Sequence, residues 1–116
     1  MASDRSDLLQ GTLELLVLKA LSLEPMHGWG IGHRIDQLSR GVFQVNQGSL
    51  YPALQRMVRK GWIRSEWRVT EHGRQARYYA LSSLGRQHLR EEASSWRRTS
   101  EAINFVLGSR LADDTA

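Results

Sequence analysis

The segment from Asp7 to Leu23 constrains the fold most, because as an α-helix it is apolar on two sides. One face carries Leu13, Leu16, Val17, Ala20 and Leu21, and the roughly opposite face carries Leu8, Leu15 and Leu18. A helix that is apolar on both sides has to be covered on both sides. In a chain of 116 residues the domain's own core provides one cover, and we expect a distant segment or a second subunit to provide the other. The alternative is a helix buried wholly within its own domain.

Composition places the chain among small cytoplasmic proteins. The apolar share of 41% is enough for one small core, and there is no cysteine to form a disulfide framework or a thiolate metal site. No apolar run reaches the roughly 18 residues that a membrane span requires, and the N-terminus lacks the pattern of a signal peptide. We therefore expect a cytoplasmic protein without membrane contact.

The segment from Asn46 to Lys60 predicts a helix with a core stripe on one side and a polar, cationic surface on the other. The stripe consists of Leu50, Ala53, Leu54, Met57 and Val58, and the polar side carries Ser49, Tyr51, Gln55, Arg56 and Arg59 without any acidic residue. Asn46 is a good N-cap, but Pro52 would then remove a hydrogen bond in the second turn. We expect the helix to begin at Gly48 or Ser49 instead, with backbone N–H groups free for a phosphate, and to end at Gly61.

The other periodicities place the remaining elements. A helix is predicted over Gly28–Ser39 and a short extended piece over Val42–Val45. Alternation predicts strands over Ile63–Val69 and Arg77–Leu81, joined by a polar turn over residues 70–76. Because His33 occupies the third glycine position of a phosphate-binding loop, we expect Gly28, Gly30 and Gly32 to serve close helix packing.

A last helix, capped by Ser82 or Ser83, is predicted from about Leu84 to Leu107. Its apolar seam follows a 4-3-4-3-4 spacing that resembles a coiled coil: Leu89, Ala93, Trp96, Ser100, Ile103 and Leu107. The seam suits a partner helix. We therefore divide the chain into a first domain over residues 1–81, a C-terminal dimerisation helix over 82–108 and a flexible tail over 109–116.

Positive charge is concentrated around the third helix and the hairpin. Seven basic residues lie between Gln55 and Arg77, opposed only by Glu66 and Glu71, whereas the whole chain carries a net charge of +4. Such a patch is typical of a nucleic-acid binder. Together with the order of elements, it predicts a mainly α fold: a winged helix-turn-helix with a two-stranded wing and an added C-terminal dimerisation helix.

Side-chain chemistry assigns the DNA contacts. Ser49 and Gln55 suit base edges, Tyr51 suits a phosphate or a thymine methyl group, and Arg56 and Arg59 suit a phosphate or guanine. Arg74 at the hairpin tip is placed to reach a minor groove or its phosphates. The full predicted set is Gln47, Ser49, Tyr51, Pro52, Gln55, Arg56, Arg59, Arg74 and Arg77.

The run GSLYPALQRMVRKGWI, with LLQGTLELLVLKAL and HGWGIGHRI before it and RYYALSSLGRQHL after it, resembles the PadR family of bacterial transcriptional regulators. The resemblance spans roughly Leu8 to Leu107. It implies a homodimer whose C-terminal helix packs against the partner's first helix, and repression of a nearby promoter through a pseudo-palindromic operator in double-stranded DNA, released by a small effector. The family's recognition-helix and wing positions map onto Ser49, Tyr51, Pro52 and residues 74–77. The short C-terminal helix is similar to that of the family's smaller branch.

Trp96 lies in the middle of the seam, where it either anchors the dimer interface or stacks on a flat aromatic effector. The predicted interface consists of Leu8, Leu15, Leu18, Leu89, Ala93, Trp96, Ile103 and Leu107. Trp29, Trp62 and Trp67 are expected in core or hinge packing, and Tyr78 and Tyr79 on opposite faces of a strand.

No nucleophile, base and orienting group can be named together, so we expect no enzymatic activity. The four histidines show no ligand spacing, and we expect neither a metal nor a cofactor. The alternative to a sequence-specific regulator is a winged-helix module that binds RNA or a protein partner without a defined DNA operator.

Overall fold

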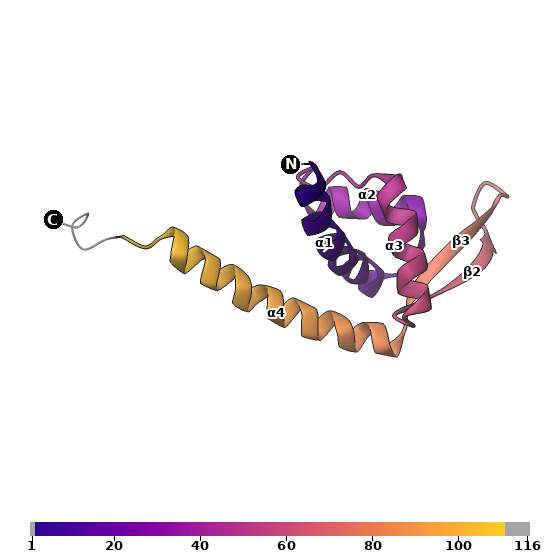
Figure 1. Ribbon diagram of the computed structural model, residues 1–116. Helices are drawn as coiled ribbons and strands as arrows, with labels where there is room; N and C mark the ends of the chain where they lie inside the picture. The colour runs from indigo at the N-terminus through magenta and orange to yellow at the C-terminus, as the bar shows by residue number, and fades with distance from the viewer. Residues whose placement is uncertain (1, 111–116) are drawn as a thin grey trace.

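The computed structural model describes residues 2–110, and the side chains of residues 11–110. Four helices and three short strands follow one another along the chain (Figure 1). They are α1 (Ala2–Leu23), β1 (Met26–His27), α2 (Gly28–Leu38), α3 (Gln47–Arg59), β2 (Ile63–Val69), β3 (Gln75–Leu81) and α4 (Ser83–Leu107). The helix α1 begins before the predicted Asp7, because no proline or glycine interrupts residues 2–10.

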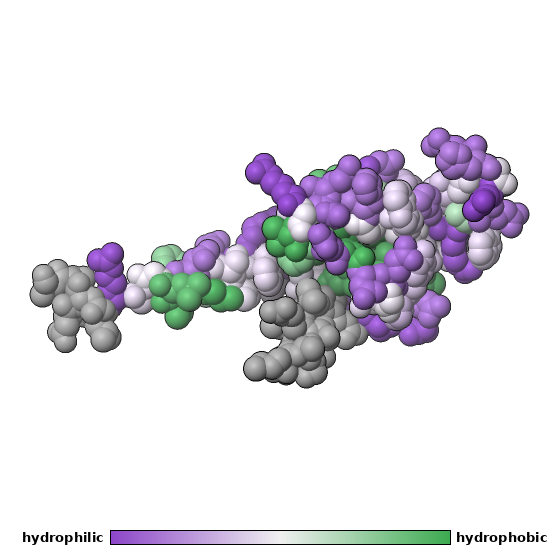
Figure 2. All heavy atoms as spheres, turned by 90° about the horizontal axis from the view of Figure 1, so that it is seen from above, coloured by the Kyte–Doolittle hydropathy of each residue, from purple (hydrophilic) through white to green (hydrophobic). Residues whose placement is uncertain are grey.

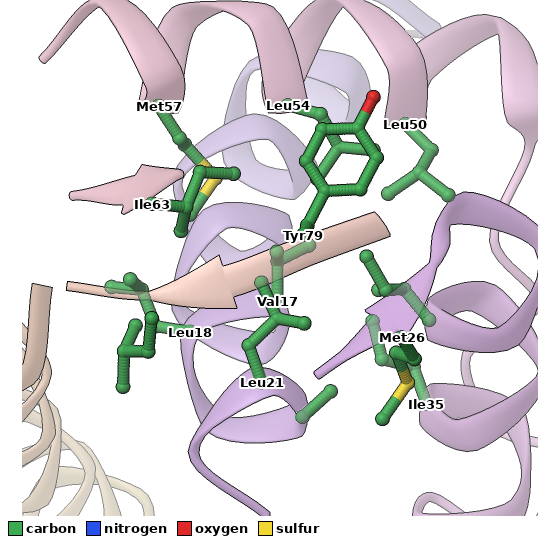
Figure 3. Close-up of a cluster of buried hydrophobic side chains, with 13 residues drawn as sticks. Val17, Leu18, Leu21, Met26, Ile35, Leu50, Leu54, Met57, Ile63 and Tyr79 are labelled. Atoms are coloured by element: carbon green, nitrogen blue, oxygen red, sulfur yellow. The ribbon is translucent and has the colours of Figure 1, made fainter. Parts of the chain in front are cut away.

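One hydrophobic core joins α1, α2, α3 and the inner end of the sheet (Figure 3). It contains Val17, Leu18, Ala20, Leu21, Met26, Ile31, Ile35, Leu50, Leu54, Met57, Ile63, Tyr79 and Leu81. The side chain of Leu18 is only 1% exposed, so the second face of α1 is partly buried within its own chain. The prediction that Leu18 faces a partner is therefore wrong: α1 rotates this position into the core, and only part of the second apolar face is left to a partner.

The strands form an antiparallel sheet in the order β1–β3–β2. Ile63 pairs with Leu81 and Val69 with Gln75, so β2 matches its prediction and β3 begins two residues before the predicted Arg77. The expected extended piece at Val42–Val45 is wrong as a strand. The free edge of β3 is occupied by Met26 and His27, which pair with Tyr79 and Tyr78. Residues 42–45 join none of these strands, and their Phe43 and Val45 side chains pack against the core instead.

The helix α3 begins at Gln47, one residue before Gly48 and two before Ser49, the two starts that we expected. The Asn46 side chain accepts a hydrogen bond from the Gly48 N–H at 2.7 Å, and the Asn46 carbonyl accepts from Ser49 and Leu50. These bonds form a complete N-cap. They stabilise the earlier start although Pro52 lacks an N–H inside the helix. The expectation of a free N–H at Ser49 is therefore wrong.

The end of α3 and the start of α4 are fastened together. Gly61 has a φ of +78°, and the Gly61 and Trp62 N–H groups bond the Val58 and Met57 carbonyls, which terminates α3 as expected. Ser82 caps α4: its Oγ accepts from the Gly85 N–H at 3.0 Å and lies 2.8 Å from the Trp62 carbonyl, to which it donates. The direction in which α4 leaves the domain is thereby set by backbone contacts.

Two projections extend from the core (Figure 1). The β2–β3 hairpin, which we call the wing, points away on one side, and α4 extends as a long arm on the other. The molecule is consequently elongated, with extents of 68 × 27 × 24 Å. Most of β2 beyond Ile63 is exposed, and every described residue from Glu101 onward is exposed. Both projections therefore carry surface that the other described residues do not cover.

Candidate nucleic-acid interface

The helix α3 presents the polar surface that its sequence predicted. Leu50, Ala53, Leu54 and Met57 are buried against the core. The exposed positions are Gln47, Gly48, Ser49, Tyr51, Pro52, Gln55 and Arg59. They bring together amide, hydroxyl and guanidinium groups without a carboxylate, the chemistry that base edges and phosphates require.

Tyr51 is held in place by the start of α2. A Cβ atom added to Gly28 would lie 2.8 Å from both the Cε1 and the hydroxyl oxygen of Tyr51. A side chain at residue 28 would displace this ring, which agrees with the expectation that Gly28 serves close helix packing. Tyr51 thus reaches the exposed surface of α3 with one side of its ring packed on α2.

Arg56 does not share that free surface. Its Nε donates to Oε2 of Glu14 on α1 at 3.2 Å, and the two side chains are only 27% and 15% exposed. An ion pair of this kind is less screened by solvent than a surface pair. Arg56 links α3 to α1, whereas Arg59 remains exposed; a DNA contact by Arg56 stays a prediction.

The wing carries the remaining predicted contacts at two different levels. Arg74 lies exposed in the turn after Gly73, whose φ is +77°, and its carbonyl accepts from the Thr70 N–H at 2.7 Å. Arg77 lies within β3 and not at the tip, directly opposite Trp67 of β2. Burial raises the pKa of the neighbouring Tyr79 above its ordinary value, and the positive charge of Arg77 acts in the opposite direction.

The tryptophans divide between hinge and surface. Trp62, half-buried, stacks on His88 of α4 at 3.8 Å and has the Lys60 Nζ 4.6 Å from its ring, as expected for a hinge residue. Trp29 and Trp67 are 60% and 61% exposed, so the expectation that they lie in the core is wrong. Trp29 stacks on the exposed His33 and Trp67 lies on the projecting wing; neither element has core beneath it at these positions. Tyr79 is buried and Tyr78 half-buried, as the alternation predicted.

A groove of about 540 Å³ separates α1 from α4. Leu15 and Trp96, both predicted to lie at a dimer interface, line it together with Glu14, Trp62, His88 and Glu92. Leu89 packs against the core and Ala93 is half-buried. Ile103 and Leu107 are exposed on the outer part of α4. The Leu8 side chain and residues 111–116 of the predicted tail lie outside the described residues.

Two negative findings apply to the described part of the chain. No three His, Asp or Glu side chains within it converge on a position that suits a metal ion. None of its helices combines the length and the apolar character needed to cross a bilayer.

A three-helix core, a basic recognition surface and a two-stranded wing define a winged helix-turn-helix protein. Residues 17–91 match the family model described as the transcriptional regulator PadR-like family, and the chain belongs to that family. This confirms the family resemblance and the fold class read from the sequence.

Named relatives agree with this assignment. A transcriptional regulator of Mycobacterium tuberculosis is 38% identical over 75 residues, which cover 65% of this chain and 66% of that protein. A PadR-like transcriptional regulator from Bacillus cereus superposes with a TM-score of 0.77 at 27% identity, covering 90% of this chain and 99% of that one. A PadR family regulator from Eggerthella lenta gives a TM-score of 0.76 at 27% identity, covering 94% and 93%.

Proposed function

We propose that this protein is a dimeric, sequence-specific DNA-binding repressor of a nearby promoter, released by a small-molecule effector. The observation that carries the proposal is the exposed surface of α3, which holds Ser49, Gln55 and Arg59 without a carboxylate beside a wing that bears Arg74. Placed in a major groove, α3 would present Gln55 and Ser49 to base edges and Arg59 to a phosphate or guanine. Family membership supports this use of the surface.

The dimer is inferred from the outer part of α4. Ile103, Phe105, Val106 and Leu107 are 48–77% exposed, and Figure 2 shows hydrophobic atoms gathered on this arm. An apolar helix end that the described residues leave exposed suits a second copy of the chain. Leu15 on α1 and Trp96 on α4 line the groove that such a partner helix would meet. Two recognition helices would then read a pseudo-palindromic operator.

The effector is assigned to the groove between α1 and α4. The Trp62 and Trp96 rings suit a flat aromatic molecule, and the carboxylates of Glu14 and Glu92 line the same space. Glu14 also holds Arg56 of α3. An effector in this groove would therefore act beside an ion pair that positions the recognition helix.

Fluorescence anisotropy on the chain's own upstream region, across a salt series and with unrelated duplex as competitor, tests the proposal. We expect a preference of roughly 10³-fold or more for the upstream fragment, at one dimer per site. Arg59→Ala should lower the salt slope by about one, whereas Gln55→Ala should reduce the preference and leave the slope unchanged. Gln87→Ala, which alters an exposed glutamine on α4, is the matched control.

Equal and steeply salt-dependent binding to both duplexes would contradict the proposal. Binding that depends on the arginines alone, without any effect of Gln55→Ala, would instead favour a module that binds RNA or a protein partner. Specific binding by a single chain would support a defined operator but contradict the proposed dimer.

A further inference from the structure

The wing carries two arginine–aromatic pairs, one on each face. The guanidinium carbon of Arg77 lies 5.4 Å from the centre of the Trp67 ring, and that of Arg68 lies 5.3 Å from the centre of the Tyr78 ring. Successive side chains of a strand point to opposite faces. Arg77 and Trp67, which are paired across β2 and β3, therefore share the face of the buried Tyr79, and Arg68 and Tyr78 occupy the other.

The two arginines differ in charge compensation. Arg68 donates from Nε to Oε1 of Glu66 at 2.7 Å, so its charge is neutralised by a neighbour on the same face. Arg77 donates from Nε to the neutral Ser65 hydroxyl at 3.1 Å. Within the described residues no carboxylate lies within ion-pair distance of Arg77. Arg68 on one face of the wing is thus paired with a carboxylate, whereas Arg77 on the other face is not.

Ser65 and Trp67 fix the orientation of Arg77. The hydroxyl of Ser65 accepts the hydrogen bond from Nε, and the guanidinium carbon lies over the indole ring of Trp67, an arrangement that favours a cation. The two terminal nitrogens have no partner among the described residues and remain available to a bidentate acceptor such as a phosphate. Trp67 is 61% exposed, so this ring is not there to fill the core. A guanidinium held in advance loses less freedom when it binds.

The face that carries Arg77 continues the surface beside α3. Figure 3 shows the ring of Tyr79 extending from β3 toward α3, with its hydroxyl between Leu50 and Leu54. Arg77 is two residues before Tyr79 on the same strand face. A duplex seated on the exposed side of α3 would therefore meet the Arg77 face of the wing, where an uncompensated cation faces the sugar–phosphate backbone.

We propose that Ser65, Trp67 and Arg77 form a binding site for one phosphodiester group of the DNA backbone next to the base pairs that α3 reads. Arg77 binds the phosphate oxygens, and Ser65 and Trp67 are positioning residues that present its guanidinium. The opposite face, with Arg68, Glu66 and Tyr78, stays out of the complex. This inference rests on the proposed function and assigns a role to two residues outside the predicted set of DNA contacts.

The test compares the salt dependence of binding to the upstream duplex for variants of the two faces. Arg77→Ala should lower the slope of log K against log salt by about one, and Arg68→Ala on the opposite face should leave it unchanged. Trp67→Leu should weaken binding by about two- to fivefold, and Trp67→Phe, which keeps a ring, should restore most of that loss. Each variant's melting temperature is measured first; the exposed positions of these side chains predict little change.

A double-mutant cycle separates positioning from a direct contact. If Trp67 acts through Arg77, then Trp67→Leu adds almost nothing to Arg77→Ala. If the effects of Trp67→Leu and Arg77→Ala on binding are fully additive, the positioning role of Trp67 is overturned. If Arg68→Ala lowers the slope of log K against log salt, the phosphate is bound on the opposite face of the wing, and this assignment is overturned. Specific binding by the wild type with no change in Arg77→Ala would overturn this inference alone. If the wild-type protein binds no duplex DNA, the proposed function is contradicted as well.

Discussion

The two halves of α4 have opposite relations to the rest of the chain. The first turns are fastened to the domain: Ser82 caps them, Gly85 is buried against the Trp62 carbonyl, and Leu89 packs on the core. The last turns, from Glu101 to Leu107, are exposed at every residue, and none of them belongs to the core formed by the described residues. At 25 residues the helix is about 37 Å long, so one element spans from a fixed joint to a free apolar end.

The difference separates folding from assembly. Contacts in the first half determine where the arm points, and the apolar residues of the second half supply surface that a single chain does not bury. Substitutions in the two halves should therefore differ in what they change: the stability of one chain near the joint, and association of two chains at the far end.

The largest effect on stability is expected for Gly85→Ala. The new Cβ would lie 2.0 Å from the Trp62 carbonyl oxygen, a backbone atom that cannot turn away. We expect a loss of roughly 3 kcal/mol or more in the free energy of unfolding, measured by urea denaturation. Gly32→Ala is the matched control, because its Cβ would meet nothing closer than 3.7 Å and alanine is favoured in a helix by about 1 kcal/mol. Equal stability of the two variants would show that the backbone around Trp62 and Gly85 shifts to accommodate the new Cβ.

A smaller effect is expected for His88→Ala at the same joint. His88 stacks on the half-buried Trp62 at 3.8 Å, and removal of such a pair costs about 1 kcal/mol. His33→Ala is the control, since His33 stacks at 5.1 Å on Trp29, which is 60% exposed. Denaturation of both variants gives the comparison. A loss as large in His33→Ala would mean that the stacking at the joint has no special role.

The smallest effect on a single chain, and the largest on assembly, is expected for Phe105→Ser. Phe105 is 77% exposed, so a surface substitution of this kind should change the intrinsic stability by less than about 0.5 kcal/mol. Sedimentation should instead show weaker dimerisation and a melting temperature that depends less on concentration. Val42→Ser, at 76% exposure in the loop before α3, should leave sedimentation unchanged. If Val42→Ser alone disrupts the dimer, the interface lies elsewhere.

Local patterns predicted most of the elements of this protein. The alternation in Ile63–Val69 gave β2 with its observed bounds, and Gly61 and Gly73 marked turns that need a positive φ. The stripe in α3 separated Leu50, Leu54 and Met57 from the exposed positions. These features depend on neighbours in the sequence, which is why periodicity and turn chemistry were sufficient to find them.

Other features depend on distant neighbours and were missed. Nothing near Met26 in the sequence indicates that it pairs with Tyr79, and Arg56 is paired with a carboxylate 42 positions away in the sequence. The patterns also could not show which apolar residues have core beneath them. Leu18 is buried and Trp67 exposed because of where α1 and the wing lie, although both belong to apolar patterns.

The sequence by itself determined the order of the four helices and the β2–β3 hairpin, the polar and cationic chemistry of α3, and the family. Those properties follow from periodicity, residue type and motif, which depend only on residues that are close to one another in the sequence. Only the tertiary structure decided which cations remain free. Arg56 and Arg68 meet carboxylates, whereas Arg77 meets a hydroxyl and an indole. The charge that an arginine offers to a ligand is set by the groups that folding brings to it, and spacing along the chain does not specify those groups.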